Sequence, residues 1–248
     1  MANPDVADLV IDMRYNGGGL LDIVAELGYM IAGASATSGR TAFKVEFNDK
    51  HQVVDPFTDE AIKPKLFFNR VLVQSGSLGA ALPSLNLSRV FVLTTIDTRS
   101  ASEVLMNAQQ GVDVEVIQIG GTTCGKPCGF YSTDNCGTTY SSVNFRSLNA
   151  LGFGDYGDGF SPADNNPIDE VILPGCNLPE DLNHSLGDPD EELLYAALRY
   201  RLDPTYWSIR TTPASTTPTL QAHTEPTSHI ESGLAHLTIT PLGSTPGR

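Results

Sequence analysis

Residues 89–120 contain two apolar, β-branched runs separated by a segment with helical spacing. The runs are RVFVLTT (89–95) and VEVIQIG (114–120), and the segment between them, SEVLMNAQQG (102–111), ends on a glycine, a common helix stop. A helix connecting two strands is typical of parallel pairing, because parallel strands need a long crossover connection. The pattern predicts an α/β fold with a mixed, largely parallel sheet flanked by helices.

The same alternation extends toward both ends of the chain. LLDIVAELGYMIAG (20–33) predicts a helix that ends at Gly33. GDPDEELLYAALRYRL (187–202) predicts a second helix, with Asp188 as its cap, Pro189 in its first turn and Glu191 completing a capping box. Further strands are predicted at 8–13, 41–47, 138–147 and 169–175.

Length and charge limit the possible partners. The 248 residues suffice for a sizeable core, and the net charge of −14 would repel nucleic acid and anionic membrane surfaces. No apolar run approaches the roughly 18 residues of a membrane span. The first residues lack the pattern of a signal peptide and enter a strand almost at once, so we expect the downstream part of a longer protein.

The composition changes near the C-terminal end. Residues 211–248 include ten Thr, four Ser and five Pro, too few apolar groups to offset the entropy of ordering the backbone. We therefore expect a folded domain at 1–208 and a flexible tail at 209–248. One short strand within LAHLTITPL (234–242) is an alternative for part of that tail.

GGTTCGKPCG (120–129) has the glycine and lysine spacing of a phosphate-binding loop. Such a loop needs a hydroxyl residue after the lysine and a helix whose first amides face the anion. Here Pro127 follows Lys126 and supplies neither a hydroxyl nor an N–H, and the next residues show no helical periodicity. The sequence therefore argues against a nucleotide as ligand.

Three loops that follow predicted strands carry the polar residues typical of hydrolases. They are DMRYNGGG (12–19), TRSASE (98–103) and TTCGKP (122–127). If their strands are neighbours, the loops meet at one carboxyl-end crevice. Ser100 would then be a nucleophile, Lys126 its base, and the amides of Gly18 and Ala101 an oxyanion hole.

Each loop also has a simpler interpretation. The glycines at 17–19 alone could form a tight turn, Ser100 or Ser102 could only cap a helix, and Gly-Lys-Pro could be a surface turn. The conjunction of the three, in this order, favours a serine–lysine hydrolase.

These motifs resemble the catalytic domain of C-terminal processing peptidases, also called tail-specific proteases. The resemblance runs from about residue 5 to about residue 205 and includes the spacing of 26 from Ser100 to Lys126. It implies a core of the ClpP/crotonase type, Ser100 as nucleophile, Lys126 as general base, and Gly18 and Ala101 as oxyanion donors. It also implies protein or peptide substrates, no cofactor, and a parent protein outside the cytoplasm, in the periplasm or cell envelope.

The sequence departs from that family at two positions beside the lysine. Many members carry Glu where this chain has Gly121, and a Gln where it has Phe130. Glu103 and Asn107, on the helix after the nucleophile, are candidates for the orienting residue. The family's PDZ domain and N-terminal helical domain have no counterpart in this sequence.

The cysteines and histidines add further hypotheses. Zinc is disfavoured, because Cys124 and Cys128 have no second ligand pair with suitable spacing. If the protein works outside the cytoplasm, as the resemblance implies, we expect a disulfide between Cys136 and Cys176; free thiols are the alternative. His184 could serve a Ser–His–Asp triad. Asp155 and Asp158 lie in a glycine-rich loop that lacks a calcium-ligand pattern.

The function predicted from the sequence is a serine endopeptidase that cleaves C-terminal or unstructured protein segments through an acyl-enzyme. The alternative is a non-catalytic module on the same fold that binds peptides or other ligands. Acyl transfer on small thioesters is a third hypothesis, and it would need an adenine pocket that the sequence does not contain. The sequence leaves the oligomeric state open.

Overall fold

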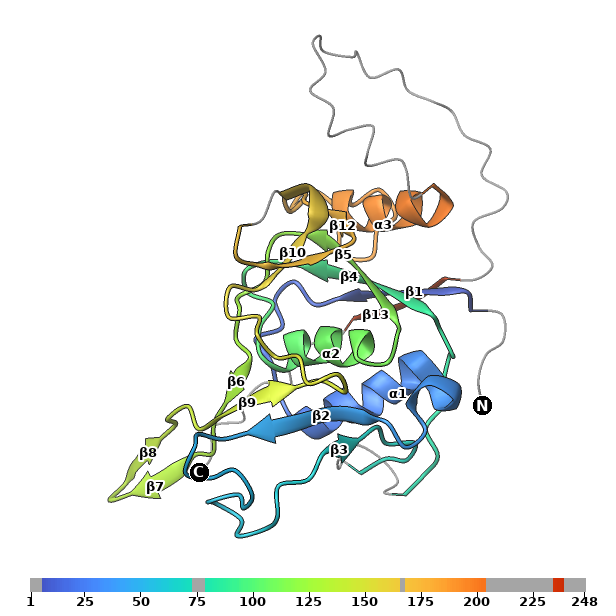
Figure 1. The fold of residues 1–248 in the computed structure, drawn as a ribbon. Helices are drawn as coiled ribbons and strands as arrows, with labels where there is room; N and C mark the ends of the chain where they lie inside the picture. Colours follow the sequence, from blue (N-terminus) through green and yellow to red (C-terminus); the bar gives the residue numbers. More distant parts are fainter. Residues whose placement is uncertain (1–5, 73–78, 166–167, 204–233, 239–248) are drawn as a thin grey trace, which may run out of the picture.

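A five-stranded parallel sheet runs through the middle of the computed structural model of the chain (Figure 1). The structure describes residues 6–72, 79–165, 168–203 and 234–238. The sheet has the strand order β12-β5-β4-β1-β13, and each neighbouring pair is parallel. Its strands are β1 (Asp8–Asp12), β4 (Arg89–Thr94), β5 (Glu115–Gly120), β12 (Gly175–Cys176) and β13 (Leu234–Thr238). The predicted mixed α/β class with a largely parallel sheet is confirmed.

Helices cover both faces of this sheet, with α1 (Leu21–Thr37) and α2 (Ala101–Gln110) on one side and α3 (Glu192–Leu202) on the other (Figure 1). Alternate residues of β1 serve the two layers. Leu9 and Ile11 belong to the core that includes residues of α1 and α2, and Val10 belongs to the core that includes residues of α3. A strand that is buried on both faces needs apolar residues at nearly every position, so it forms a continuous apolar run in the sequence. These runs are the pattern that predicted the strands.

The helix predicted to end at Gly33 instead continues to Thr37. Gly33 has φ 72° and ψ 177°, so the chain bends there and then resumes its helical course. Only glycine adopts this backbone without steric penalty. A Cβ at this position would lie 1.8 Å from Oδ1 of Asn86. The glycine therefore marks a bend in α1.

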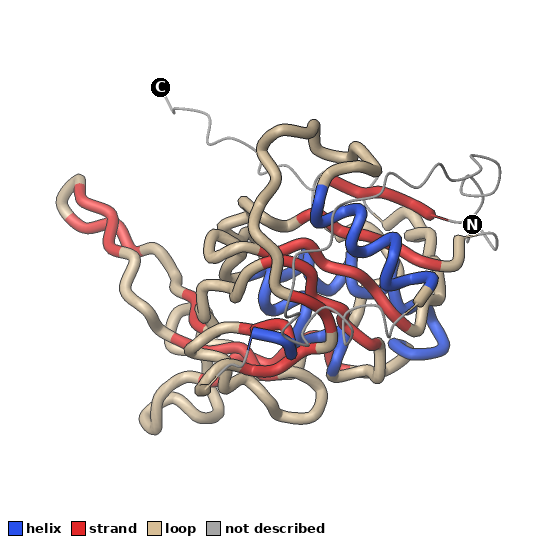
Figure 2. Tube along the Cα trace, turned by 90° about the horizontal axis from the view of Figure 1, so that it is seen from above, coloured by secondary structure: helices blue, strands red, loops and turns tan. Residues whose placement is uncertain are grey.

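A second, antiparallel sheet lies beyond α1 and α2, with the order β3-β2-β9-β6 (Figure 1). It consists of β2 (Thr41–Glu46), β3 (Lys65–Leu66), β6 (Cys128–Gly129) and β9 (Phe145–Leu148). The hairpin of β7 (Thr133–Asn135) and β8 (Thr138–Tyr140) extends away from the body, as Figure 2 shows. The single strand predicted at 138–147 is therefore wrong: it divides into β8 and β9.

The strand predicted at 169–175 also divides in two. Val171–Leu173 is β11, which pairs in parallel with β10 (Phe160–Pro162), and the chain then crosses to β12 at the edge of the central sheet. A short 3-10 helix, η1 (Ala163–Asn165), follows β10.

The third helix begins later than predicted. Asp188 closes a turn instead, because its side chain accepts a 3.0 Å bond from Asp190 N and its carbonyl accepts one from Glu191 N. Glu191 is the N-cap, and its carboxylate accepts a 3.0 Å bond from Leu194 N. The acidic residue predicted to complete the capping box is thus the cap itself.

Strand β13 falls within the tail predicted to be flexible. It pairs in parallel with β1, from Asp8 opposite Leu234 to Asp12 opposite Thr238. The expectation of a flexible tail is corrected for these five residues, and the alternative of a short strand holds for 234–238. Residues 204–233 and 239–248 lie outside the described part of the chain. Within the described ranges, no helix has both the length and the apolar character needed to cross a bilayer.

Candidate active site

Three polar loops meet at the carboxyl ends of β1, β4 and β5. They are the glycine loop (12–19), the serine loop (98–103) and the lysine loop (122–127). Thr98, in the serine loop, links that loop to the other two, because its hydroxyl donates to the carbonyl of Met13 at 2.7 Å and its own carbonyl accepts from Cys124 N at 3.0 Å. Arg99 N adds a 3.1 Å bond to the carbonyl of Asn16. Hydrogen bonds therefore hold the glycine loop, the serine loop and the lysine loop together at the edge predicted from parallel pairing.

Ser100 stands immediately before α2 with an uncommon backbone. Its φ is 58° and its ψ is −120°. A residue with a side chain seldom adopts a positive φ, and such strain clusters at functional sites. Ser100 is half-buried and lines a cleft beside the three loops. Ser102 is buried and donates to the carbonyl of Asn16 at 3.2 Å, so it secures the glycine loop.

The carboxylate of Glu103 joins the serine loop to the lysine loop. One oxygen accepts from Thr123 Oγ1 at 2.6 Å and from Gly125 N at 2.7 Å. The other accepts from Lys126 N at 2.8 Å and from Ser100 N at 2.9 Å. Glu103 is fully buried, and four donors satisfy its charge. This predicted orienting residue therefore contacts the main chain of the lysine loop rather than the lysine amine.

Lys126 is half-buried, and its side chain reaches the same cleft as Ser100. Its Nζ lies 5.4 Å from the centre of the Phe130 ring. Among the described hydrogen bonds, none joins this Nζ to Ser100 Oγ. A short strand, β6, follows Lys126 where a phosphate-binding loop would have a helix. The structure thus places both predicted catalytic side chains in one cleft without a direct bond between them.

Gly18 approaches Ser100 closely. It has φ 116°, and a Cβ at this position would lie 2.7 Å from Ser100 Cβ and 3.3 Å from Ala101 N. The Gly18 N–H donates to Oδ1 of Asn16 at 2.9 Å. The Ala101 N–H donates no hydrogen bond within the described part of the chain. The two predicted oxyanion donors are therefore neighbours, and one is occupied by the side chain of Asn16.

The cleft beside these residues has a volume of about 1080 Å³. Strands β2 and β9 supply an apolar wall, and the segment 55–65 forms another side. Tyr131 connects that segment to the chain after Lys126. Its hydroxyl donates to Asp55 at 3.0 Å, and its ring lies 4.8 Å from that of Phe57. Burial, followed by this bond to Asp55, raises the pKa of Tyr131 to about 12. The lining of the cleft includes Gly19, Ser100, Lys126, Phe130 and Tyr131.

A buried ion-pair network connects the glycine loop to helix α3. Arg14 is 1% exposed and binds Asp12 at 2.6 Å and Glu191 at 2.7 Å. Burial lowers the pKa of Arg14, but the two carboxylates raise it more, so the guanidinium stays charged. Because Glu191 also caps α3, the network ties that helix to the loop. Sequence reasoning missed this network, since 177 positions separate the two partners.

Two other candidates lie elsewhere. The side chain of Asn107 donates to the carbonyl of Phe153 at 2.9 Å and accepts from Asn149 at 2.9 Å. It therefore secures the loop at 149–153, and its proposed orienting role is corrected. His184 is exposed, pairs with Asp181 and does not line the cleft. That pairing raises the pKa of His184.

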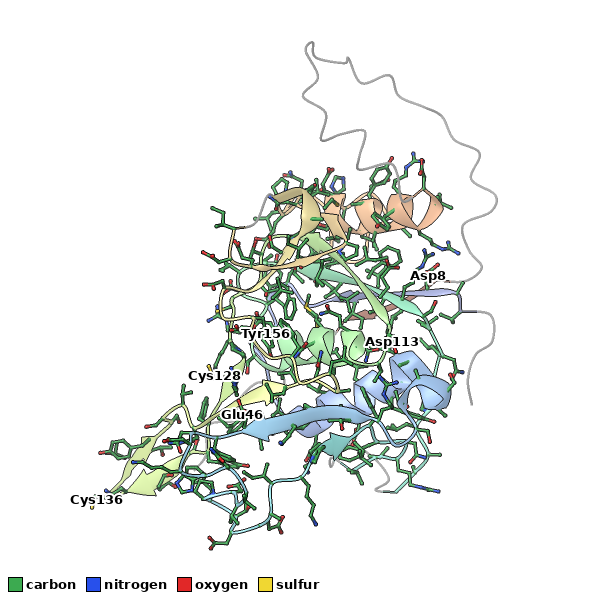
Figure 3. The ribbon with its side chains drawn as sticks, in the orientation of Figure 1. Asp8, Glu46, Asp113, Cys128, Cys136 and Tyr156 are labelled. Carbon is green, nitrogen blue, oxygen red and sulfur yellow. The ribbon has the colours of Figure 1, made fainter. Side chains whose placement is uncertain are left out.

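The cysteines do not form the predicted bridge between Cys136 and Cys176. Cys136 is a free, exposed thiol in the turn between β7 and β8, at the far end of the hairpin in Figure 3. Cys176 is fully buried in the core that includes residues of α3. The disulfide prediction is therefore wrong, because sequence spacing gave no information on this separation. Within the described residues, no group of three His, Cys, Asp or Glu side chains could hold a metal ion.

The family model of peptidase family S41 matches residues 1–132, more than half of the chain. The chain belongs to peptidase family S41. The matched region contains all three loops of the site, including Ser100 and Lys126. The predicted membership is thus confirmed.

Solved structures of proteases resemble this S41 chain. One is a Bacteroides fragilis NCTC 9343 protein assigned to the S41 proteases, with 29% identity, a TM-score of 0.59, and coverage of 80% of this chain and 45% of that one. Another is a photosystem II D1 C-terminal processing protease, with 23% identity, a TM-score of 0.42, and coverage of 68% and 35%. The chain thus spans less than half the length of these proteins. No curated protein matches it significantly.

Proposed function

We propose that this chain is the catalytic part of a serine endopeptidase with a Ser100–Lys126 dyad. The observation that carries the proposal is that both side chains line one cleft, while the Glu103 carboxylate binds the main-chain N–H of each. Membership of family S41 supports the peptidase activity. We assign protein or peptide substrates, cleaved in C-terminal or unstructured segments, and no cofactor.

The chemistry that this arrangement supports has two steps. The neutral amine of Lys126 takes the proton of Ser100 Oγ as the oxygen attacks the scissile carbonyl carbon, and the ammonium then gives that proton to the leaving amine. Water, deprotonated by the same lysine, next attacks the carbonyl carbon of the acyl-enzyme. The acyl group leaves as a carboxylic acid, and the lysine ammonium returns its proton to Ser100 Oγ, which restores the serine. The lysine must be neutral at the start of each step.

The oxyanion hole of this mechanism is the Ala101 N–H together with the Gly18 N–H. The Ala101 amide stands at the positive end of α2, where the helix dipole favours a developing negative charge. The Gly18 amide becomes available when the oxyanion takes the place of Asn16 Oδ1. The resting bond to Asn16 keeps this donor satisfied until substrate arrives.

The fold and the location of the parent protein follow from the resemblance. We assign the core to the ClpP/crotonase type, residues 1–208 to the catalytic domain, and the parent protein to an extracytoplasmic compartment, the periplasm or cell envelope. Family membership supports these assignments.

One observation favours a second candidate, a binding module that holds peptides without cleaving them. The Lys126 amine lies over the Phe130 ring and makes no described bond to Ser100. In such a module the same cleft would bind the peptide, and Ser100 would stay unmodified.

Labelling with a serine-reactive acylating probe, followed by peptide mass spectrometry, separates the two candidates. We expect the label on Ser100 of the wild-type chain and of the control Ser141→Ala, which changes an exposed serine directly after β8. The label should be lost, with no change in melting temperature, in three variants: Ser100→Ala, Lys126→Ala and Lys126→Arg. The first removes the nucleophile and the second the base. The third replaces the amine with a guanidinium, which does not deprotonate. A folded wild type without label would favour the binding module. Label retained in Lys126→Arg would point to another base, with His184 the first to test.

A further inference from the structure

We propose that Phe130 is a positioning residue for Lys126, and that the face of its ring holds the lysine amine at the cleft and favours its protonated form. The inference deepens the proposed function, on which its catalytic meaning rests. Its geometry is independent of that function: Nζ lies 5.4 Å from the ring centre, within the roughly 6 Å at which a cation is attracted to an aromatic face.

Both ends of this contact are fixed by the fold. The Glu103 carboxylate binds the main-chain N–H groups of Gly125 and Lys126 at 2.7 and 2.8 Å. Phe130 directly follows β6, whose Gly129 pairs with Phe145 of β9 and accepts a 3.0 Å bond from Asn144 N. The main chain is thus held on both sides of the contact, and both side chains line the cleft.

The packing of the ring indicates more than a core role. Phe130 is 42% exposed, whereas the neighbouring Phe145 is 9% exposed. A phenylalanine that served only the core would be expected to bury its faces. Here the ring stays open to the cleft, and the amine of Lys126 covers it.

Other charged groups of the cleft also act on the amine. Carboxylates favour the ammonium and neighbouring ammonium groups oppose it. Several of these groups are already engaged: Asp55 binds the hydroxyl of Tyr131, and Asp22 lies 3.4 Å from Lys65. Within the described structure, the aromatic ring that Lys126 contacts is that of Phe130. Substitution of Phe130 therefore removes this contact while the charged groups of the cleft stay in place. The titratable side chains that line the cleft with Lys126 are Asp22, Asp55, Glu60, Lys63, Lys65, Cys128 and Tyr131, and Glu103 lies beneath the loop.

This contact has a consequence for activity at neutral pH. A ring that attracts the ammonium holds the amine in place but opposes the loss of the proton that makes it a base. The site therefore gains a positioned lysine at the cost of a smaller share of the neutral amine.

The test measures the lysine directly, without reference to catalysis. An amine-acylating reagent is applied over a range of pH to the wild type, Phe130→Leu and Phe130→Trp, and modification of Lys126 is quantified by peptide mass spectrometry. Tyr140→Leu is the matched control, an exposed aromatic on β8 that does not line the cleft. Leucine keeps apolar bulk without a π face, and tryptophan is a stronger one.

We expect the midpoint of Lys126 modification to fall by about half a pH unit in Phe130→Leu and to rise in Phe130→Trp. Tyr140→Leu should leave it in place. An unchanged midpoint in both Phe130 variants, or a shift in the same direction in both, would overturn the proposal. Labelling of Ser100 in untreated samples of the same variants, over the same pH range, should follow these midpoints. A chain whose Lys126 midpoints shift as expected but whose Ser100 never reacts would disprove the endopeptidase while leaving the role of Phe130 intact.

Discussion

Glu103 and Lys126 are joined by a hydrogen bond of 2.8 Å from the lysine main-chain N–H to the buried carboxylate. The same carboxylate oxygen accepts from Ser100 N, so one atom fixes the relative position of the two proposed catalytic residues. The base is therefore positioned through its backbone, which leaves its side chain free to move within the cleft. Substitutions at Glu103 should alter the site without touching either reactive group.

Glu103→Gln should lower the free energy of unfolding by about 2–4 kcal/mol and reduce acylation of Ser100 at least about tenfold. The amide replaces one acceptor oxygen with an NH₂ group that faces two N–H or O–H donors, so two buried bonds are lost. Urea denaturation and the labelling assay measure the two effects. Glu115→Gln, on the exposed end of β5, is the control and should change neither. Equal behaviour of the two variants would contradict the role of Glu103.

Gly18→Ala should abolish acylation of Ser100, whereas Gly19→Ala should largely retain it. A Cβ at Gly18 would lie 2.7 Å from Ser100 Cβ on a backbone with φ 116°, and a Cβ at Gly19 would have no atom within 4 Å. The two adjacent glycines thus provide a matched pair. The labelling assay compares them, and similar labelling of both would show that the contact at Gly18 does not constrain the nucleophile.

The central sheet and the meeting of the three loops could be predicted because they depend on local patterns. Strands buried on both faces require continuous apolar runs, and parallel strands bring their carboxyl ends to one edge. Gly18 was identifiable for a related reason, since a glycine between a strand and a helix marks close backbone approach. Each of these inferences uses residues that are neighbours in sequence.

The contacts that the sequence could not give connect distant segments. Nothing near Arg14 indicates that Glu191 is its partner, and Asn107 has the same helical position whether it faces the site or the loop at 149–153. The same limit applies to the disulfide, because the residues around Cys136 and Cys176 do not indicate that one thiol is exposed on a hairpin and the other is buried in the core. Side-chain direction over such separations is decided by tertiary packing.

Arg14→Met should destabilise the fold by about 3–5 kcal/mol. It leaves the carboxylates of Asp12 and Glu191 buried without their counter-charge. Arg146→Ala is the comparison, because its 2.6 Å pair with Glu46 is half-exposed and should contribute at most about 1 kcal/mol. Chemical denaturation of both variants gives the two values. A loss at Arg14 no larger than that at Arg146 would mean that the buried network relaxes or admits water.

Asp8→Asn should destabilise the protein at pH 7, and the loss should shrink as the pH falls below about 4. Burial raises the pKa of Asp8, but its bonds to Arg89 at 2.5 Å and Arg201 at 2.8 Å lower that pKa by a larger amount. The pKa of Asp8 is therefore lower in the folded protein than in the unfolded chain. The stabilisation is then complete above about pH 4 and is lost as the pH falls through the folded value. Urea denaturation over this range measures it. Asp113→Asn, with an exposed carboxylate, should show no comparable trend.

Tyr156→Phe should stabilise the fold by about 1 kcal/mol. Tyr156 is 1% exposed, and its hydroxyl has no hydrogen-bond partner within the described structure. Burial, and then the charge of Glu103, raise the pKa of this hydroxyl, so it stays a neutral group that has lost its water. Phenylalanine keeps the ring that stacks 4.8 Å from Phe160 and removes only the unpaired oxygen. Thermal melting provides the measurement, and a lower melting temperature would show that the hydroxyl has a partner, such as an ordered water, beneath the lysine loop.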